Sequence, residues 1–292
     1  MKQRSAKWIL VFILALTFSS LFSVFASADM GPKASVDVTF TGLGDKVCYV
    51  TLLSKTRSTG PHSVWNGDDE YRYTWPNEEI WYAFVTYEDP DGYYFLQDTL
   101  YSVSESKNTA RWGYYPPKSY KILVYDPETA TFYSSDIYER YAFHSYYSVH
   151  LSFQEGEPLM PIETYDTSAQ IQAMLIRLVI TLLVEMGLAY LFGFRRLPAF
   201  LVVLGINVAT QLMLNLALNK IYILAGSLMM LIYYVLLECL IIVIEAIAYA
   251  IAHKKIYKGK LWWIAAPLHS LILNVASFAT GILLSTVLPE FF

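Results

Sequence analysis

The chain has 292 residues, 55% of them hydrophobic, with a mean hydropathy of +0.37 and a formal net charge of −4. It is too apolar for an ordinary water-soluble protein, and its apolar residues gather in long runs from Ile171 onward. Residues 29–168 hold 10 basic and 21 acidic side chains, a net −11, whereas residues 169–292 hold 8 and 4, a net +4. An acidic domain joined to an apolar one argues against nucleic acid as a partner.

The first 28 residues have the features of an export signal. Three basic residues lie within the first seven, an apolar stretch follows from Trp8, and Ala-Ser-Ala at 26–28 precedes Asp29. A basic start, an apolar middle and an Ala-x-Ala end are typical of a cleaved secretory signal peptide. An uncleaved membrane anchor is the alternative, and the Ala-x-Ala pattern favours cleavage. We therefore expect a signal peptide of bacterial style at 1–28, followed by an exported domain.

Residues 29–165 alternate apolar and polar side chains in short runs, as strands with one buried face do. The predicted strands cover residues 35–40, 46–54, 80–88, 93–103, 119–125, 129–138 and 145–153. Turn sequences separate them, including Asp-Pro-Asp-Gly at 89–92, a strong hairpin signal. Short strands joined by hairpins predict an exported all-β domain, and we expect an immunoglobulin-like β-sandwich. Tyrosine-rich stretches such as 112–117 suit half-buried strands and loops, and a role in stacking on a ligand stays open.

Residues 166–292 form the predicted transmembrane domain, because a membrane span takes roughly 20 apolar residues. The predicted spans cover about 170–193, 198–218, 221–251 and 261–287. In membrane proteins, Lys and Arg residues are concentrated in the cytoplasmic loops. Arg195 and Arg196 lie in the first connection and four lysines lie within 254–260, whereas the second connection holds only Lys220. These charges agree with the signal peptide and predict a multi-pass protein of the plasma membrane, with the β-domain and the C-terminus extracytoplasmic.

Polar side chains within these apolar runs are the candidate functional site. An ionisable group at the centre of a membrane helix costs about 2.5–3.5 kcal/mol on insertion scales, so it normally faces protein or water. The predicted intramembrane polar cluster consists of Glu185, Asn207, Gln211, Glu238, Glu245 and Asn274. The candidate accessory residues are Arg177, Tyr249 and His269. Hydrogen bonding between packed helices is the structural alternative, most of all for the amides.

Helical geometry supports one shared cluster. At about 100° per residue, Glu238, Glu245 and Tyr249 fall on one stripe of their helix. The amides of the second span form a stripe of their own, and on the last span His269 points away from Asn274. One polar residue from each span lies near the same depth, which predicts a buried cluster shared by four helices.

The stretches ADMGPKASVDVTFTGL at 28–43 and YKILVYDPETATFYSSDIYERYAF at 120–143 resemble a bacterial membrane protein family without an assigned activity. Its members pair a signal peptide and an exported β-domain with a C-terminal four-helix membrane bundle, and the resemblance implies this architecture alone. The sequence differs from CAAX-type intramembrane proteases at each motif of that family. Glu238 and Glu245 are seven residues apart rather than adjacent, and no Arg follows them.

Three functions compete on this evidence. In the first, the β-domain binds or senses a surface ligand or protein partner and the bundle anchors it in the lipid bilayer. In the second, the midplane carboxylates serve ion or proton-coupled transport, and a homo-oligomer is needed because four spans are few. In the third, Glu185, Glu238 or Glu245 acts as base or metal ligand of an intramembrane hydrolase, with His269 beside it. The HExxH, GxSxG and P-loop motifs are absent from the sequence, so we favour the non-enzymatic function, expect no cofactor and leave metal binding open.

Overall fold

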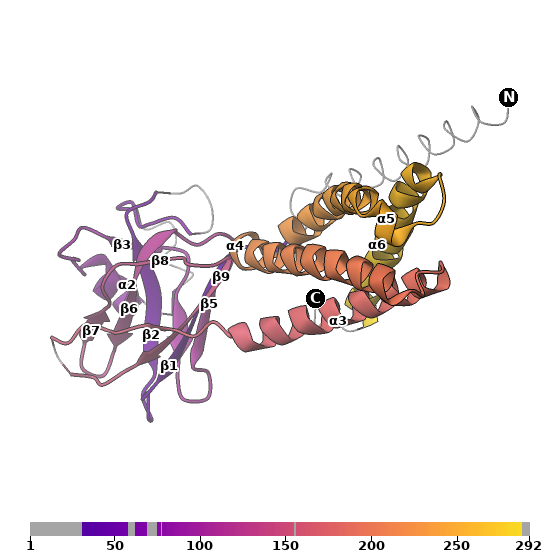
Figure 1. Ribbon diagram of the computed structural model, residues 1–292. Coiled ribbons are helices and arrows are strands. Elements are labelled where there is room, and N and C mark those ends of the chain that lie inside the picture. Colours follow the sequence, from indigo (N-terminus) through magenta and orange to yellow (C-terminus); the bar gives the residue numbers. More distant parts are fainter. Residues whose placement is uncertain (1–30, 58–61, 69–74, 77, 155, 288–292) are drawn as a thin grey trace. The chain divides into compact units, whose positions relative to one another are not determined.

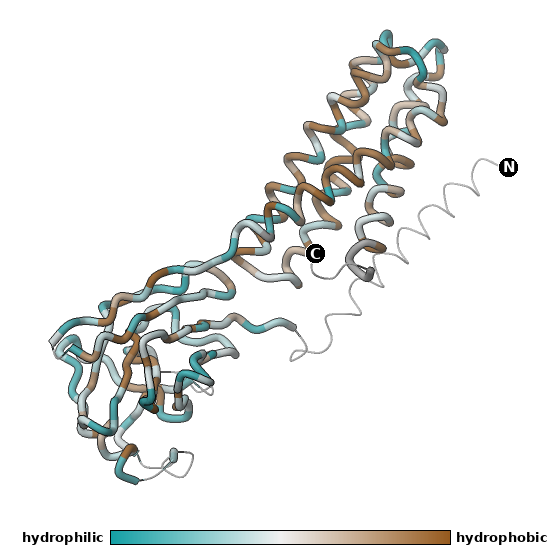
Figure 2. Tube along the Cα trace, turned by 90° about the horizontal axis from the view of Figure 1, so that it is seen from below, coloured by the Kyte–Doolittle hydropathy of each residue, from teal (hydrophilic) through white to brown (hydrophobic). Residues whose placement is uncertain are grey.

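The computed structural model describes residues 31–57, 62–68, 75–76, 78–154 and 156–287. The predicted signal peptide at 1–28 and the C-terminal residues 288–292 lie outside the described residues. A region of strands is followed by a region of helices, as the order along the chain in Figure 1 shows. In Figure 2 the helical region is mostly brown, and therefore hydrophobic, whereas teal and brown alternate along the strands.

The first of two sheets has the spatial order β10-β9-β1-β5. Its strands are Ile162–Glu163 (β10), His144–His150 (β9), Ser35–Thr41 (β1) and Thr109–Trp112 (β5). β1 runs parallel to β9, with Val38 opposite Tyr147, and antiparallel to β5, with Val38 opposite Ala110. Because parallel neighbours need a long crossover, this pairing joins two distant parts of the chain.

The second sheet has the spatial order β3-β2-β6-β7, with β4 also paired to β2 and β8 to β6. Its strands are Tyr94–Phe95 (β3), Cys48–Ser54 (β2), Ser119–Asp126 (β6), Thr131–Ser134 (β7), Tyr101–Val103 (β4) and Tyr138–Glu139 (β8). β6 and β7 form the antiparallel pair predicted around the turn at 126–128, with Tyr125 opposite Phe132.

One hydrophobic core is shared by the two sheets. Its members are every second residue along each strand, the ones whose side chains face inward. This period of two is expected for sheets with one buried face. They include Val36, Val38 and Phe40 of β1, Val50 and Leu52 of β2, Ile122 and Val124 of β6, and Tyr147 and Val149 of β9. The β region is therefore built from sheets that pack on each other, and its immunoglobulin-like topology stays a prediction.

Residues 80–88 were predicted as a strand, and this is wrong because they contribute to a helix. α2 covers Glu78–Val85, with two acidic residues in its first turn that complement the helix dipole. Trp81 and Phe84 lie one turn apart, both buried, and pack edge to face on Phe95 with ring centroids 5.6 and 5.9 Å apart. The prediction of an all-β domain is therefore wrong at this element. The spacing of its apolar residues also fits a helix, and the helix places Trp81 and Phe84 against Phe95.

Two predicted hairpins connect elements that do not pair. The turn at 89–92 leads from α2 into β3 rather than joining two strands. The turn at 41–45 leads from β1 to β2, which belong to different sheets. Both segments contain turn-forming residues, but these residues do not determine which sheet the next strand joins.

The helical region consists of α3 (Thr167–Leu191), α4 (Leu197–Ile251), the short α5 (His253–Ile256) and α6 (Trp262–Val287). Three of these helices, α3, α4 and α6, are long and apolar enough to cross a membrane, where the sequence predicted four spans. The three helices contact one another. Both middle predicted spans lie within α4.

α4 is interrupted at Gly226, whose φ of 82° and ψ of 177° are not helical. This backbone conformation is essentially restricted to glycine. An unbroken helix of 55 residues would be about 80 Å long, far more than a bilayer core of roughly 30 Å. We call residues 197–225 the first arm and residues 227–251 the second arm.

The two arms of α4 fold back on each other. Asn207 bonds to Tyr249 and Thr210 bonds to Glu245, so residue numbers rise along one arm as they fall along the other. Figure 1 shows the arms as two separate coils. Lys220, predicted to lie in a loop, is helical and belongs to the first arm, because the chain reverses at the glycine and not at the charged residue.

Candidate functional site

Polar side chains from α3, both arms of α4 and α6 form a row inside the helical region, which we call the polar line. All of its members are buried except Tyr234, which is partly buried. Its members are Tyr234, Glu238, Glu185, Gln211, Ser277, Thr210, Glu245, Asn274, Ser270, Asn207 and Tyr249. The six predicted cluster residues all lie in it, and none is more than 5% exposed. From Tyr234 to Tyr249 the second arm rises about 22 Å, at 1.5 Å per residue.

Glu245 ties three helical segments together. Thr210 of the first arm donates to its Oε1 at 2.7 Å, and Asn274 of α6 donates to its Oε2 at 2.5 Å. Asn274 Nδ2 also donates to the Ser270 carbonyl at 2.9 Å, and Ser270 Oγ donates to the Ile242 carbonyl at 2.7 Å. Both carboxyl oxygens of Glu245 are therefore satisfied, as hydrogen-bonded contacts between packed membrane helices require.

Glu185 joins α3 to the first arm of α4. Gln211 Nε2 donates to Glu185 Oε1 at 2.7 Å and lies 3.4 Å from Ser277 Oγ of α6. The second oxygen, Glu185 Oε2, is buried and has no hydrogen-bond partner among the described residues. This carboxyl group is thus only half satisfied.

Tyr249 and Asn207 form the next contact along the polar line. The Tyr249 hydroxyl donates to Asn207 Oδ1 across the two arms of α4. Asn207 Nδ2 remains buried without a partner among the described residues. This pair therefore keeps one unused donor next to a hydroxyl group that can both donate and accept.

Glu238 differs from the other two glutamates. It is 5% exposed, and neither carboxyl oxygen has a hydrogen-bond partner among the described residues. Tyr234 lies one turn before it on the same face of the second arm. Tyr234 is the polar group that acts on this carboxyl group, and it belongs to the same arm. The contact joins no two helices, so adhesion between helices does not explain Glu238.

The three carboxyl groups lie close enough to repel one another when ionised. Among the described residues, no ion pair links any of them to a basic side chain. Burying uncompensated like charges is costly in an apolar environment. The group therefore requires charge compensation from protons or a cation, and this is the chemistry that a proton or ion site uses.

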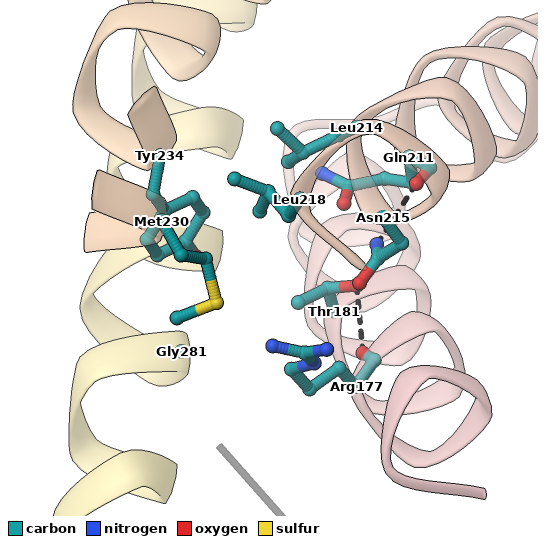
Figure 3. A pocket seen from close by; sticks show the side chains of 9 residues that line it. All are labelled: Arg177, Thr181, Gln211, Leu214, Asn215, Leu218, Met230, Tyr234 and Gly281. Atoms are coloured by element: carbon teal, nitrogen blue, oxygen red, sulfur yellow. Dashed lines mark hydrogen bonds between the residues drawn. The ribbon is translucent and has the colours of Figure 1, made fainter. Parts of the chain in front are cut away.

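A small pocket with a cavity volume of about 30 Å³ opens beside this group (Figure 3). Its lining includes Arg177 and Thr181 of α3, Gln211 of the first arm and Tyr234 of the second arm. In Figure 3 the Arg177 guanidinium group points across the pocket toward Met230. Gln211 belongs both to the pocket wall and to the Glu185 hydrogen bond, so the pocket reaches the polar line.

His269, a predicted accessory residue, does not join the polar line. Its Nδ1 atom lies 3.0 Å from the Tyr257 hydroxyl, and its ring stacks on Tyr257 with 5.5 Å between centroids. No group of three or more His, Cys, Asp or Glu side chains in the described part of the chain is arranged to hold a metal ion. A hydrolase that pairs a glutamate with His269 therefore has no geometric support.

Four members of the polar line were missing from the predicted set: Thr210, Tyr234, Ser270 and Ser277. Thr210 is one turn from Asn207 and adjacent to Gln211, so its position on the polar face was readable from spacing. Tyr234 precedes Glu238 by one turn, and the same spacing rule marks it. Thr210 and Tyr234 were overlooked because Thr and Tyr are common in apolar helices and carry no charge.

Comparison of the chain with models of protein families, with curated proteins and with solved structures finds no match. Function has to be inferred from the site itself. The arrangement combines ionisable groups, unused hydrogen-bonding atoms and a pocket within apolar helices, which suits binding and passage of protons or small cations better than bond-breaking chemistry.

Proposed function

We propose that the protein is a multi-pass membrane component that moves or exchanges protons along the polar line, as part of a proton-coupled or ion-coupled transport process. Glu238 takes up a proton from the side of the Arg177 pocket, and Glu185 and Glu245 are the next exchangeable groups. Tyr249 and Asn207 continue the row toward the end of the bundle that holds His269. One observation carries the proposal: Glu238 is buried among apolar helices with both carboxyl oxygens unpaired.

The spacing of the glutamates supports this role. Glu238 and Glu245 are seven residues apart, or about 10.5 Å along the helix axis. Glu185 is close enough to interact electrostatically with both, and Gln211 donates a hydrogen bond to it. Carboxyl and hydroxyl groups both donate and accept protons, whereas the amides orient them. Rows of ionisable and hydroxyl side chains at membrane depth mark proton relays in pumps and transporters.

Proton flux into proteoliposomes tests the proposal. Purified protein is reconstituted with a trapped pH-sensitive dye, and a potassium gradient with valinomycin drives proton entry. We expect Glu238→Gln to lower the flux at least tenfold, because the amide cannot release a proton. The exposed β-region variant Glu163→Gln serves as the matched control and keeps the wild-type rate. Wild-type flux equal to that of empty vesicles, or an unchanged flux in Glu238→Gln, contradicts the proposal.

We also propose that each arm of α4 is one span, which gives four spans with the β region outside the cytoplasm. The support is the charge distribution: Arg195, Arg196 and the lysines at 254–260 lie at one end of the bundle. Single cysteines placed at Tyr94 and at Lys258, in a Cys239→Ser background, report the orientation. An impermeant maleimide should label position 94 in intact cells and position 258 only after lysis, and the reverse pattern refutes the topology.

A second candidate function, recognition of a surface ligand or partner by the β region, is supported by a strained aromatic loop. Tyr114 and Tyr115 have φ values of 63° and 62° and are 48% and 55% exposed. Such left-handed backbone costs of order 1–2 kcal/mol per residue and concentrates at binding sites. Holding two large aromatic side chains outward in this way suits contact with a ligand.

A pocket with a cavity volume of about 270 Å³ adjoins this loop, and its lining includes Tyr115, Lys118, Arg140 and Tyr141. Arg140 Nε is buried without a hydrogen-bond partner among the described residues, and this burial lowers the pKa of the guanidinium group below its ordinary value. Lys118 adds a second positive charge. The pocket therefore suits an anionic group, which would supply the missing acceptor.

Binding of a polyanionic probe tests this second function. Full-length protein in nanodiscs is titrated with poly-glutamate, and affinity is measured by thermophoresis. We expect Arg140→Gln and Lys118→Gln each to weaken binding at least fivefold. Lys107→Gln, which removes an exposed lysine away from the pocket, should bind as the wild type does. Equal affinity in all four proteins counts against an anion site at this pocket.

A further inference from the structure

The end of the helical region that joins α3 to α4 and α4 to α6 is strongly basic. The two connections carry Arg195, Arg196, Lys254, Lys255, Lys258 and Lys260. The sequence has no Asp or Glu between Glu185 and Glu238, or between Glu245 and Glu290. No ion pair involves these six side chains among the described residues. Within the described part of the chain, their charge is therefore not compensated by an acidic side chain.

A pocket with a cavity volume of about 380 Å³ lies between the two connections. Three of the six basic residues line it: Arg195 and Arg196 from the first connection and Lys258 from the second. Arg195 lies over the Tyr190 ring, 5.1 Å from its centroid, which orients the guanidinium group. Charges from two separate parts of the chain thus converge on one cavity.

One wall of this pocket is a packed aromatic group. Tyr257 and His269 stack with their rings nearly parallel, at 4°, and Phe194 meets His269 edge to face at 4.8 Å. The Tyr257 hydroxyl and His269 Nδ1 are 3.0 Å apart. Rings held on several sides have few alternative rotamers, so this wall gives the pocket a fixed shape. It also offers polar atoms beside the positive charges.

The chemistry of this lining selects an oxyanion. Arginine presents a planar set of donors that matches phosphate, and lysine adds a point charge. The first turn of α4 begins at the pocket, and no side chain caps it, so its backbone N–H groups add to the positive potential. The lining contains no carboxylate that would compete for these donors.

Exposed apolar side chains next to the pocket indicate a lipid as the source of the oxyanion. Leu191 and Leu197 flank the first connection and are 73% and 67% exposed, and Leu261 and Trp263 follow the second and are 65% and 61% exposed. A free phosphate ion needs no such surface, whereas the acyl chains of a phospholipid would cover it. We propose that this pocket binds the phosphate of an anionic phospholipid, with Arg196 and Lys258 as its principal contacts.

This proposal is independent of the proton-transfer function, because no carboxyl group of the polar line enters the pocket. Anionic lipids are bound at basic pockets between membrane helices by the same combination of charge and apolar contact. Lys254 and Lys255 lie nearby in the sequence but do not line the cavity. Lys254 and Lys255 therefore provide a control with the same total charge as Arg196 and Lys258, which line the cavity.

Native mass spectrometry of the full-length protein with phosphatidylglycerol or phosphatidylcholine tests the site. We expect the wild type to retain phosphatidylglycerol at least fivefold better than phosphatidylcholine. The double variant Arg196→Gln/Lys258→Gln should lose this preference, whereas Lys254→Gln/Lys255→Gln, with the same loss of charge, should keep it. Lys258→Gln alone, at an exposed position, gives an intermediate result if the double variant is unstable.

Three outcomes overturn the assignment. Equal loss of preference in both double variants means that surface charge alone attracts the lipid. Equal retention of the two lipids by the wild type means that there is no anion site. Displacement of bound phosphatidylglycerol by millimolar inorganic phosphate assigns the pocket to a free phosphate ion instead of a lipid.

Discussion

The β region and the helical region bury charged side chains in opposite ways. In the β region Lys121 is buried, and its Nζ atom contacts Asp89 Oδ1 at 2.8 Å and Asp91 Oδ2 at 2.5 Å. Lys46 likewise pairs with the buried carboxyl group of Asp126. In the helical region three glutamates are buried with no such pair in the described residues. Paired charges indicate a structural role, and unpaired ones indicate chemistry.

The reason for the difference lies in the cost of isolated charges. In a buried ion pair, the attraction between the two charges offsets much of the free energy cost of removing them from water. An unpaired buried carboxyl group has no such attraction and has to bind a proton or a cation. The paired groups of the β region therefore hold fixed states. The proposed transport function rests on the glutamates of the polar line, which have no such ion pair among the described residues.

Removing the cation of the β-region network should have the largest effect. Lys121→Met leaves Asp89, whose side chain is fully buried, without its cation. Asp89 Oδ2 still accepts from the backbone N–H groups of Asp91 and Tyr93. We expect the free energy of unfolding to fall by about 3–5 kcal/mol, the usual cost of breaking one half of a buried ion pair. Denaturant titration followed by tryptophan fluorescence measures it. The exposed control Lys107→Met should change little, and a loss below about 1 kcal/mol at Lys121 would mean that the pair is unimportant.

Within the polar line, the same substitution should affect two glutamates differently. Glu245→Met removes the acceptor used by Thr210 and Asn274, so we expect a loss of about 1–3 kcal/mol. Glu238→Met removes a carboxyl group with no partner and should leave stability unchanged or raise it. Thermal unfolding in nanodiscs compares the two variants. If Glu238→Met is the more damaging one, Glu238 is a structural residue after all.

The packing of α6 on the second arm should respond to a single added carbon. A Cβ atom at Gly281 would clash with the Tyr234 hydroxyl oxygen. Gly281→Ala should therefore destabilise the helical region by about 1 kcal/mol, the lower end for overpacking because a hydroxyl group can shift. Tyr234→Phe removes the obstructing oxygen, so the double variant should recover most of the loss in a thermal melt. Additive effects would contradict this contact.

The smallest expected effect is a pH dependence in the β region. The hydrogen bond from Lys121 lowers the pKa of Asp91 below its ordinary value. Because the folded pKa lies below the unfolded one, this contribution to stability is complete above about pH 4 and is lost as the pH falls through the lowered pKa. Wild type and Asp91→Asn should differ in unfolding midpoint at pH 7 and converge as the pH falls below the lowered pKa of Asp91. A constant difference would exclude the linkage.

Local patterns in the sequence predicted part of each region. Alternation identified β1, β2, β6 and β9, because one face of each strand packs on the shared core. The apolar runs identified the long helices, and the interruption of those runs by acids and amides identified the six buried cluster residues. The run at 80–88 was misassigned, because its apolar spacing fits a helix as well as a strand.

The sequence by itself determined which stretches are apolar, which strands have one buried face and where the glutamates lie on their helix, because these follow from the fixed periods of the backbone. Only the tertiary structure decided that α4 reverses at Gly226 and that Glu245 has two donors whereas Glu238 has none. The physical reason is that a hydrogen-bond partner comes from another helix. Its presence depends on how distant segments pack, which no local period specifies.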